Sequence, residues 1–149
     1  MAKATAEEAA LTKQKIIDAA VSITLEQGFE EATLGNLAKY IGMSRSGITC
    51  HFRYKTDISE AIEPELSAIL YASIDFSSCQ SFEDSWMSAT ESNPKFRACI
   101  ASMGPVIPSS VGFERLVKKI ENGEHQQKRN TVYKCLGYSL VEIDRIWRA

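Results

Sequence analysis

The chain has 149 residues, of which 44% are hydrophobic and 24% charged, and its formal net charge is −2. This composition is typical of one or two small globular domains and excludes a disordered, collagenous or low-complexity chain. No apolar run approaches the ~18 residues of a membrane-spanning helix. Residues 1–11 lack the apolar stretch of a secretory signal. The cysteines, which are far apart, are therefore expected to be reduced thiols of a cytoplasmic protein.

The helical spacing of apolar residues predicts three helices in the first third of the chain. The first is expected over about residues 12–27, where a glycine follows as a stop signal. Thr33 is the predicted N-cap of a second helix over about residues 33–41. After a short break, Ser44 is the predicted N-cap of a third helix over about residues 44–52.

The remainder of the chain also has a helical pattern. Further helices are expected over about residues 56–76, 82–91, 94–102, 111–120 and 124–148. Pro64 is expected to kink the first of these. No stretch shows the sustained alternation of a strand, so the expected fold class is all-α. It comprises a three-helix domain over residues 1–56 and a small helical domain over residues 57–149.

The charges are unevenly distributed along the chain. Residues 32–56 contain Lys39, Arg45, Arg53 and Lys55 but no acidic residue. Screening limits the reach of each charge to ~8–10 Å, so a local basic patch matters more for phosphate binding than the whole-chain balance. The alternative is a solvated face that happens to lack carboxylates, and charge alone does not decide between the two.

Two short helices that follow a longer one and are joined at residues 41–44 are typical of a helix-turn-helix unit. The third helix is short enough to lie in the major groove of DNA, led by Arg45, Ser46 and Gly47. The caps of the second and third helices would place free backbone N–H groups where phosphates dock. The same helical corner also occurs as scaffold, and the spacing alone leaves that alternative open.

Several short motifs occur in this region at a characteristic spacing. They are Ile16-Ile17-Asp18-Ala19-Ala20, Glu26-Gln27-Gly28-Phe29, Thr33-Leu34, Leu37-Ala38, Ile41-Gly42-Met43-Ser44 and His51-Phe52-Arg53-Tyr54-Lys55. Over about residues 12–58 the chain resembles the N-terminal domain of the TetR/AcrR family of repressors. The resemblance implies a homodimer that binds a double-stranded DNA operator with one recognition helix per subunit. It also implies that residues 1–56 are a helix-turn-helix DNA-binding domain and that residues 57–149 are a small helical dimerisation or regulatory domain. In the family this C-terminal domain usually senses a ligand, and it is shorter here than is usual.

The resemblance also implies roles for individual residues. Thr33 and His51 match phosphate contacts, and Lys55 matches a lysine that opens the fourth helix against the DNA backbone. Arg45 stands where the family reads base edges. Thr49 departs from the pattern, because the family usually places a phosphate-contacting tyrosine there. The candidate DNA-binding residues are Thr33, Ser44, Arg45, Ser46, Gly47, Thr49, His51, Arg53, Tyr54 and Lys55.

Several apolar and aromatic residues of the C-terminal part fit either a small-molecule pocket or a plain core, and core is favoured for most of them. These candidates are Phe82, Trp86, Phe96, Met103 and Tyr133. If an effector exists, it is expected to be small and apolar. It would enter between the helix around Pro64 and the segment that carries Phe82 and Trp86.

The last predicted helix carries an apolar stripe wider than one core face needs. The stripe and its glycine comprise Val132, Leu136, Gly137, Leu140, Ile143 and Trp147. The resemblance favours a dimer interface built from the last two helices of each subunit. The alternative is a helix buried on two sides within a monomer.

The sequence also bears on two other classes of function. The chain has none of the common nucleotide-binding, hydrolase or metalloprotease motifs, so no enzyme and no cofactor are expected. His51 follows Cys50, but adjacent helical residues point ~100° apart and no other Cys or His has ligand spacing, so no metal is expected. The remaining alternative is a helical protein-interaction module without DNA binding, which has no need of the acid-free stretch.

Overall fold

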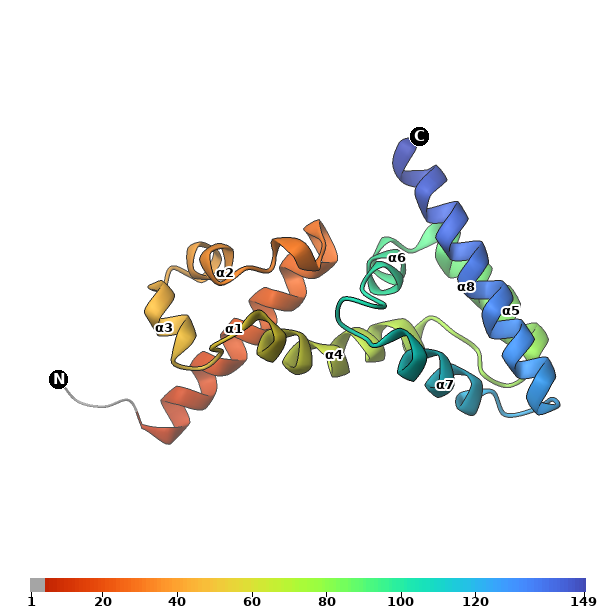
Figure 1. Ribbon diagram of the computed structural model, residues 1–149, viewed down its shortest axis with the longest axis horizontal. Coiled ribbons are helices and arrows are strands. Elements are labelled where there is room, and N and C mark those ends of the chain that lie inside the picture. The colour runs from red at the N-terminus through yellow and green to blue at the C-terminus, as the bar shows by residue number, and fades with distance from the viewer. Residues whose placement is uncertain (1–4) are drawn as a thin grey trace. The chain divides into compact units, whose positions relative to one another are not determined.

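The computed structural model describes residues 5–149 (Figure 1). Its elements are α1 (Ala6–Gln27), the 3₁₀-helix η1 (Phe29–Glu31), α2 (Leu34–Ile41), α3 (Arg45–Thr49), α4 (Lys55–Ala72), α5 (Cys79–Ser92), α6 (Pro94–Ala101), α7 (Ser109–Lys119) and α8 (His125–Arg148). Within this range there is no strand beyond an isolated bridge between Met103 and Ile107. The predicted all-α class is confirmed.

Residues 1–4, which belong to the segment considered above for a secretory signal, lie outside the described residues. None of the helices in residues 5–149 combines the length and apolarity that a membrane crossing requires.

The start of α1 differs from the sequence prediction. α1 begins at Ala6 rather than near residue 12, because Thr5 and Glu8 form a capping box ahead of it. The amide of Glu8 donates to Thr5 Oγ1 at 3.1 Å, and the amide of Thr5 donates to Glu8 Oε2 at 3.2 Å. The prediction was wrong because residues 6–11, the first turns of α1, are largely exposed and therefore show no helical spacing of apolar side chains.

The end of the third helix also differs. α3 stops at Thr49, whereas a helix up to residue 52 was expected. The chain tightens after Thr49, and the amides of His51 and Phe52 both donate to the carbonyl oxygen of Ile48, each at 2.9 Å. Phe52 is nevertheless buried, as its apolar spacing indicates.

The chain divides into two compact units between Leu66 and Ser67, inside α4. The boundary predicted between residues 56 and 57 is therefore too early. The first turns of α4 belong to the N-terminal unit because they bury Ile58, Ile62 and Leu66. α4 continues as one helix through Pro64.

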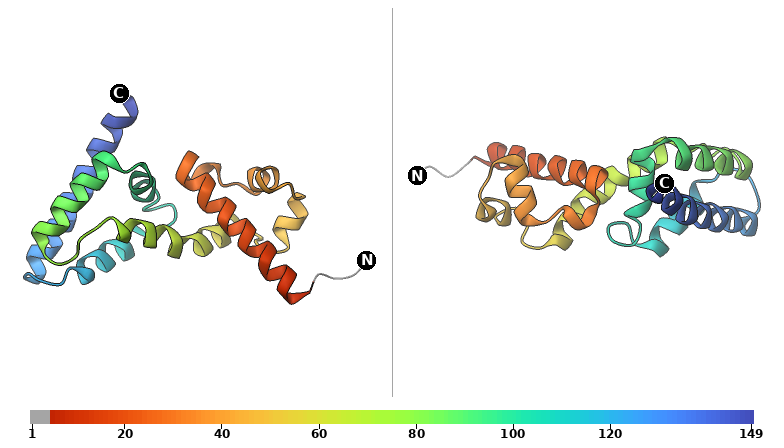
Figure 2. Two further views of the ribbon diagram at one scale, coloured as in Figure 1. Left: turned by 180° about the vertical axis from the view of Figure 1, so that it is seen from behind. Right: turned by 90° about the horizontal axis from the view of Figure 1, so that it is seen from above.

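In the N-terminal unit, α1 packs against α2, and α2 packs against α3 (Figure 1). Buried apolar side chains from all three helices form its core: Ile16, Ala20, Ile23, Leu37 and Ile48. In the C-terminal unit, α5 and α8 lie side by side in the views of Figures 1 and 2.

The core of the C-terminal unit is an aromatic cluster. The ring of Trp86 stacks on Phe82 at a centroid distance of 5.3 Å and meets Phe96 edge-on at 5.1 Å. Trp86 Nε1 donates to Ser139 Oγ at 2.7 Å, and Ser139 shares a second hydrogen bond of 2.7 Å with Thr90. All three rings are completely buried. Phe82, Trp86 and Phe96 therefore belong to the core, which is the interpretation that the sequence favoured for most of these residues. The effector entry expected beside Trp86 is wrong, because these side chains fill that space themselves.

Candidate nucleic-acid interface

Two side-chain caps and one glycine build the corner between α2 and α3. Thr33 Oγ1 accepts from the amide of Asn36 at 3.1 Å and starts α2. Gly42 has a φ of 70°, a left-handed conformation that ends α2 and redirects the chain. Ser44 Oγ accepts from the amide of Gly47 at 3.1 Å and starts α3. Both predicted N-caps are confirmed.

Most of the predicted DNA-binding residues lie at the surface of this corner. The exposed ones are Thr33, Ser44, Arg45, Ser46, Thr49, Arg53 and Tyr54. Gly47, His51 and Lys55 are half-buried. Arg45 and Ser46 occupy the first turn of α3, which a major-groove reader would present to the bases.

The charges of this surface are not neutralised by carboxylates. Among the described residues, no acidic side chain pairs with Lys39, Arg45 or Arg53. Arg53 lies beside the ring of Tyr54, with its Cζ 5.5 Å from the ring centroid. The acid-free stretch of the sequence therefore forms a surface whose guanidinium groups are available to an anionic partner.

The packing around the start of α3 leaves little room for a side chain at Gly47. A Cβ at this position would lie 2.9 Å from Met43 Cε and 3.2 Å from Ser44 Oγ, so a side chain would press on the cap of α3. The hydroxyl of Thr49 donates to the carbonyl oxygen of Ser46 at 3.0 Å. The hydroxyl oxygen of Thr49 can still accept a hydrogen bond, but the hydroxyl proton is already donated within α3.

Lys55 makes a contact that the sequence did not indicate. Its Nζ donates to the carbonyl oxygen of Glu30 at 2.9 Å and lies 4.7 Å from the ring centroid of Phe29. Both partners belong to η1, and Glu30 lies 25 positions earlier in the chain. No local pattern links such distant residues. Tyr40, which was not among the predicted residues, is also exposed on α2 beside Lys39.

The cysteines do not form a candidate metal centre. Within residues 5–149, no group of three or more His, Cys, Asp or Glu side chains is placed to share an ion. Cys50 is exposed after α3, whereas the other three cysteines are buried free thiols. Burial raises the pKa of the Cys99 thiol to about 11 and that of the Cys135 thiol to about 12. These two thiols are therefore unreactive at neutral pH.

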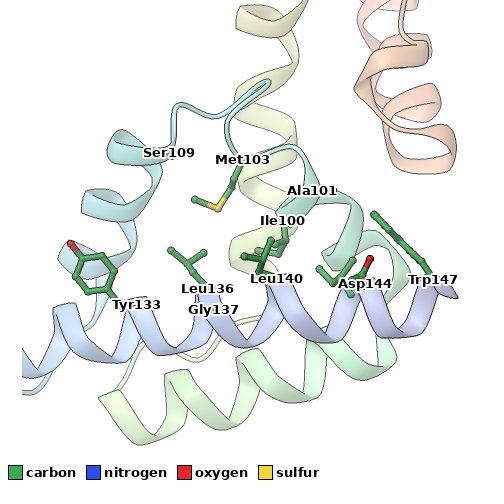
Figure 3. Close-up of a pocket in the computed structure, with 11 residues that line it drawn as sticks. Ile100, Ala101, Met103, Ser109, Tyr133, Leu136, Gly137, Leu140, Asp144 and Trp147 are labelled. Atoms are coloured by element: carbon green, nitrogen blue, oxygen red, sulfur yellow. The ribbon is translucent and has the colours of Figure 1, made fainter. Parts of the chain in front are cut away.

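A second surface feature, the α8 groove, lies in the C-terminal unit (Figure 3). It has a volume of about 640 Å³ and is lined by Ile100, Ala101, Met103, Ser109, Tyr133, Leu136, Gly137, Leu140, Ile143, Asp144 and Trp147. Leu136 and Leu140 point from α8 toward Ile100 and Met103. Leu140 is 76% exposed and Trp147 is 64% exposed. A large apolar surface is therefore left open on α8.

The α8 groove shows which of the residues predicted for the dimer interface lie at the surface of one copy. Val132 is completely buried on the core side of α8, so it cannot contact a second copy. Ile143 is almost as buried, although it is among the residues that line the groove. From α7, the second helix of the predicted interface, only Ser109 lines the groove, and α6 contributes Ile100 and Ala101. Of the predicted effector residues, Met103 and Tyr133 line this groove.

Comparison with known proteins supports the helix-turn-helix assignment. Residues 16–62 match the family model described as bacterial regulatory proteins, tetR family. The HTH-type transcriptional regulator SrpR of Pseudomonas putida is 36% identical over 86 residues, 58% of this chain and 39% of SrpR. The uncharacterized HTH-type transcriptional regulator TtgW, also of Pseudomonas putida, is 36% identical over 86 residues, 58% of this chain and 63% of TtgW.

The alignment with these two relatives thus extends over less than two thirds of either one. The crystal structure of BioQ with its natural double-stranded DNA operator aligns with 91% of this chain and 89% of that chain at 19% identity. Its TM-score of 0.46 is too low to establish a common architecture. The family model covers α1 from Ile16, both helices of the corner and the start of α4. Residues 16–62 are therefore the N-terminal helix-turn-helix domain of the tetR family of bacterial regulatory proteins.

Proposed function

We propose that this protein is a transcriptional regulator that recognises a specific operator in double-stranded DNA and acts as a repressor in the cytoplasm. The observation that carries the proposal is the pair of exposed arginines, Arg45 and Arg53, which pair with no carboxylate in the described part of the chain. A surface of this kind, on a domain of this family, is suited to the phosphates and base edges of DNA.

We assign two kinds of DNA contact to the α2–α3 corner, contacts to base edges and contacts to phosphates. Arg45 and Ser46, at the leading end of α3, are proposed to read base edges in the major groove. Thr33, which caps α2, and Arg53, which follows α3, are proposed to contact phosphates, and phosphate contacts set the register of the protein on the duplex. No step of this proposal involves catalysis, and the curated relatives are themselves described as transcriptional regulators.

We also propose that the regulator is a homodimer that pairs through the α8 groove. Leu140 and Trp147 are large apolar side chains left at the surface. The charges at this end of α8 are paired within the helix, Arg145 with Glu142 at 3.1 Å and Arg148 with Asp144 at 2.7 Å. The rim therefore carries little unpaired charge that would repel an identical helix. Two copies related by a two-fold axis would present two recognition helices to half-sites ~34 Å apart.

The DNA proposal is tested by titrating a labelled duplex with the protein over a range of salt concentrations. The duplex is selected with this protein from random DNA, and binding is followed by fluorescence anisotropy. Wild type should show a linear fall of log K with log salt. Arg53→Ala should weaken binding to all sequences alike and reduce the slope by ~0.9, the value for one phosphate contact.

Lys95→Ala provides a matched control, because Lys95 is an exposed cation of the C-terminal unit. It should leave the slope unchanged. If wild type binds no duplex in a salt-dependent way, the regulator proposal is wrong, and the interaction-module alternative replaces it.

A further inference from the structure

We infer that Lys55 is a positioning residue that closes the helix-turn-helix motif, rather than a phosphate ligand. This inference rests on the DNA-binding function proposed above and departs from the role that the family resemblance implies for this lysine. It starts from the hydrogen bond between Lys55 Nζ and the carbonyl oxygen of Glu30, at 2.9 Å.

The surroundings of the Lys55 ammonium group explain why this contact persists. Lys55 is the first residue of α4, where the positive end of the helix dipole disfavours a cation. No carboxylate among residues 5–149 pairs with it. The Glu30 carbonyl and the face of the Phe29 ring, 4.7 Å away, supply the negative partners instead. The side chain is half-buried in this position.

The contact joins the two flanks of the DNA-binding surface. On one flank, η1 leads directly to the cap at Thr33, and Asn36 Nδ2 donates to the carbonyl oxygen of Glu31 at 2.8 Å. On the other flank, Lys55 directly follows Arg53 and Tyr54, and Asp57 accepts from the amide of Tyr54 at 3.0 Å. The lysine therefore fixes the distance between the two proposed phosphate-contacting segments, one before α2 and one before α4.

This role predicts a specific pattern of DNA binding for substitutions at Lys55. Lys55→Met keeps the unbranched stem over Phe29 but removes the donor. It should lower affinity roughly 3- to 10-fold at every salt concentration, as the loss of one hydrogen bond does, and leave the salt slope unchanged. Lys55→Arg retains a hydrogen-bond donor for the Glu30 carbonyl and a cation for the Phe29 ring. It should therefore bind DNA with the affinity of wild type. Arg53→Ala, in contrast, should reduce the slope.

A control separates positioning from a general loss of stability. Ile16→Val removes a methyl group from the core of the same unit, away from both flanks, and lowers the thermal transition. Affinities are compared at a temperature well below every transition. Ile16→Val should then bind DNA as wild type does, whereas Lys55→Met should not. A slope that falls by ~0.9 in Lys55→Met, or an affinity that Lys55→Arg fails to restore, would overturn the inference.

A second measurement does not depend on DNA. Amide hydrogen exchange of the full-length protein reports the first turn of α2, where Leu37 donates to the carbonyl oxygen of Thr33 at 2.9 Å. Exchange there should be faster in Lys55→Met and unchanged in Arg53→Ala and Lys55→Arg. Unchanged exchange in Lys55→Met would show that Lys55 does not hold this flank. That result is distinct from a failure of wild type to bind DNA, which would contradict only the proposed function.

Discussion

The guanidinium group of Arg45 lies on the first turn of α3 and forms no ion pair with an acidic side chain of residues 5–149. A bidentate contact from such a group to a guanine discriminates by ~1–3 kcal/mol against another base. We therefore predict that Arg45→Ala loses about that much discrimination at one base pair of the operator. Competition titrations with operators changed one pair at a time would measure it. Lys39→Ala is the matched control and should weaken all operators equally. A uniform loss in Arg45→Ala would contradict base reading.

Ser139 holds the buried end of the C-terminal aromatic cluster, because it accepts from Trp86 Nε1 and pairs with Thr90. Ser139→Ala would leave the indole N–H without its acceptor in a closed core. We expect a loss of ~1–3 kcal/mol in the free energy of unfolding, measured by urea titration. Ser92→Ala, on the exposed end of α5, should change it by less than ~0.5 kcal/mol. Equal effects in the two variants would show that the buried network contributes little.

At the scale of elements, α5 and α8 are joined by polar contacts outside their shared core. Tyr138 Oη donates to Glu91 Oε1 at 2.6 Å, and Lys134 Nζ pairs with Glu83 Oε1 at 2.6 Å. The hydrogen bond to the Glu91 carboxylate, together with burial and the charges of Glu91 and Glu142, raises the pKa of Tyr138 to about 12 from its ordinary value of about 10.

This pKa predicts how the stability gained from Tyr138 depends on pH. The folded state favours the protonated phenol, so the gain is complete below pH 10 and is lost as the pH rises toward 12. The difference in unfolding free energy between wild type and Tyr138→Phe should be constant from about pH 7 to 9 and then decrease progressively between about pH 10 and pH 12. Urea titrations at each pH would measure it, with Tyr40→Phe as an exposed control. A difference that grows with pH would contradict this hydrogen bond.

Local signals predicted most elements of the fold. Thr33 and Ser44 cap α2 and α3 as expected, because an N-cap depends only on a side chain and the amides of the next turn. The start of α1 was missed because its first turns face solvent, where apolar periodicity gives no signal. The end of α3 was missed because it depends on the hydrogen bonds from the amides of His51 and Phe52 to the carbonyl oxygen of Ile48. These are backbone contacts, and no pattern of side chains indicates them.

At the scale of the whole molecule, the errors involve residues far apart in the sequence. Trp86 and Ser139, which are joined by a hydrogen bond, are 53 positions apart in the sequence. Without that contact, the helical spacing of an aromatic residue is compatible with either a core position or a pocket position. The division of the chain within α4 depends on which residues that helix buries in the first unit. The apolar stripe of α8 was identified correctly as too wide, but only the structure separates the buried Val132 from the exposed Leu140.

The exposed part of that stripe leads to a prediction about assembly. If two copies pair through the α8 groove, wild type should sediment at micromolar concentration with twice the 16.5 kDa mass of one chain. Leu140→Glu should give a folded monomer, because Leu140 is 76% exposed in one copy and its charge would be buried only at the interface. Gly137→Trp should do the same, since open space surrounds the Cβ position in one copy.

Leu11→Glu is the matched control for assembly, because Leu11 is a comparably exposed leucine on α1, outside the α8 groove. It should remain dimeric. Loss of the dimer should also abolish cooperative binding to a two-half-site operator while leaving weak binding to a single half-site, because only the dimer holds two recognition helices in register. A wild-type monomer at micromolar concentration would contradict the dimer. The fluorescence of Trp147 would then report whether a small apolar compound occupies the groove instead, because Trp147 lies on its rim and Trp86 is sealed in the core.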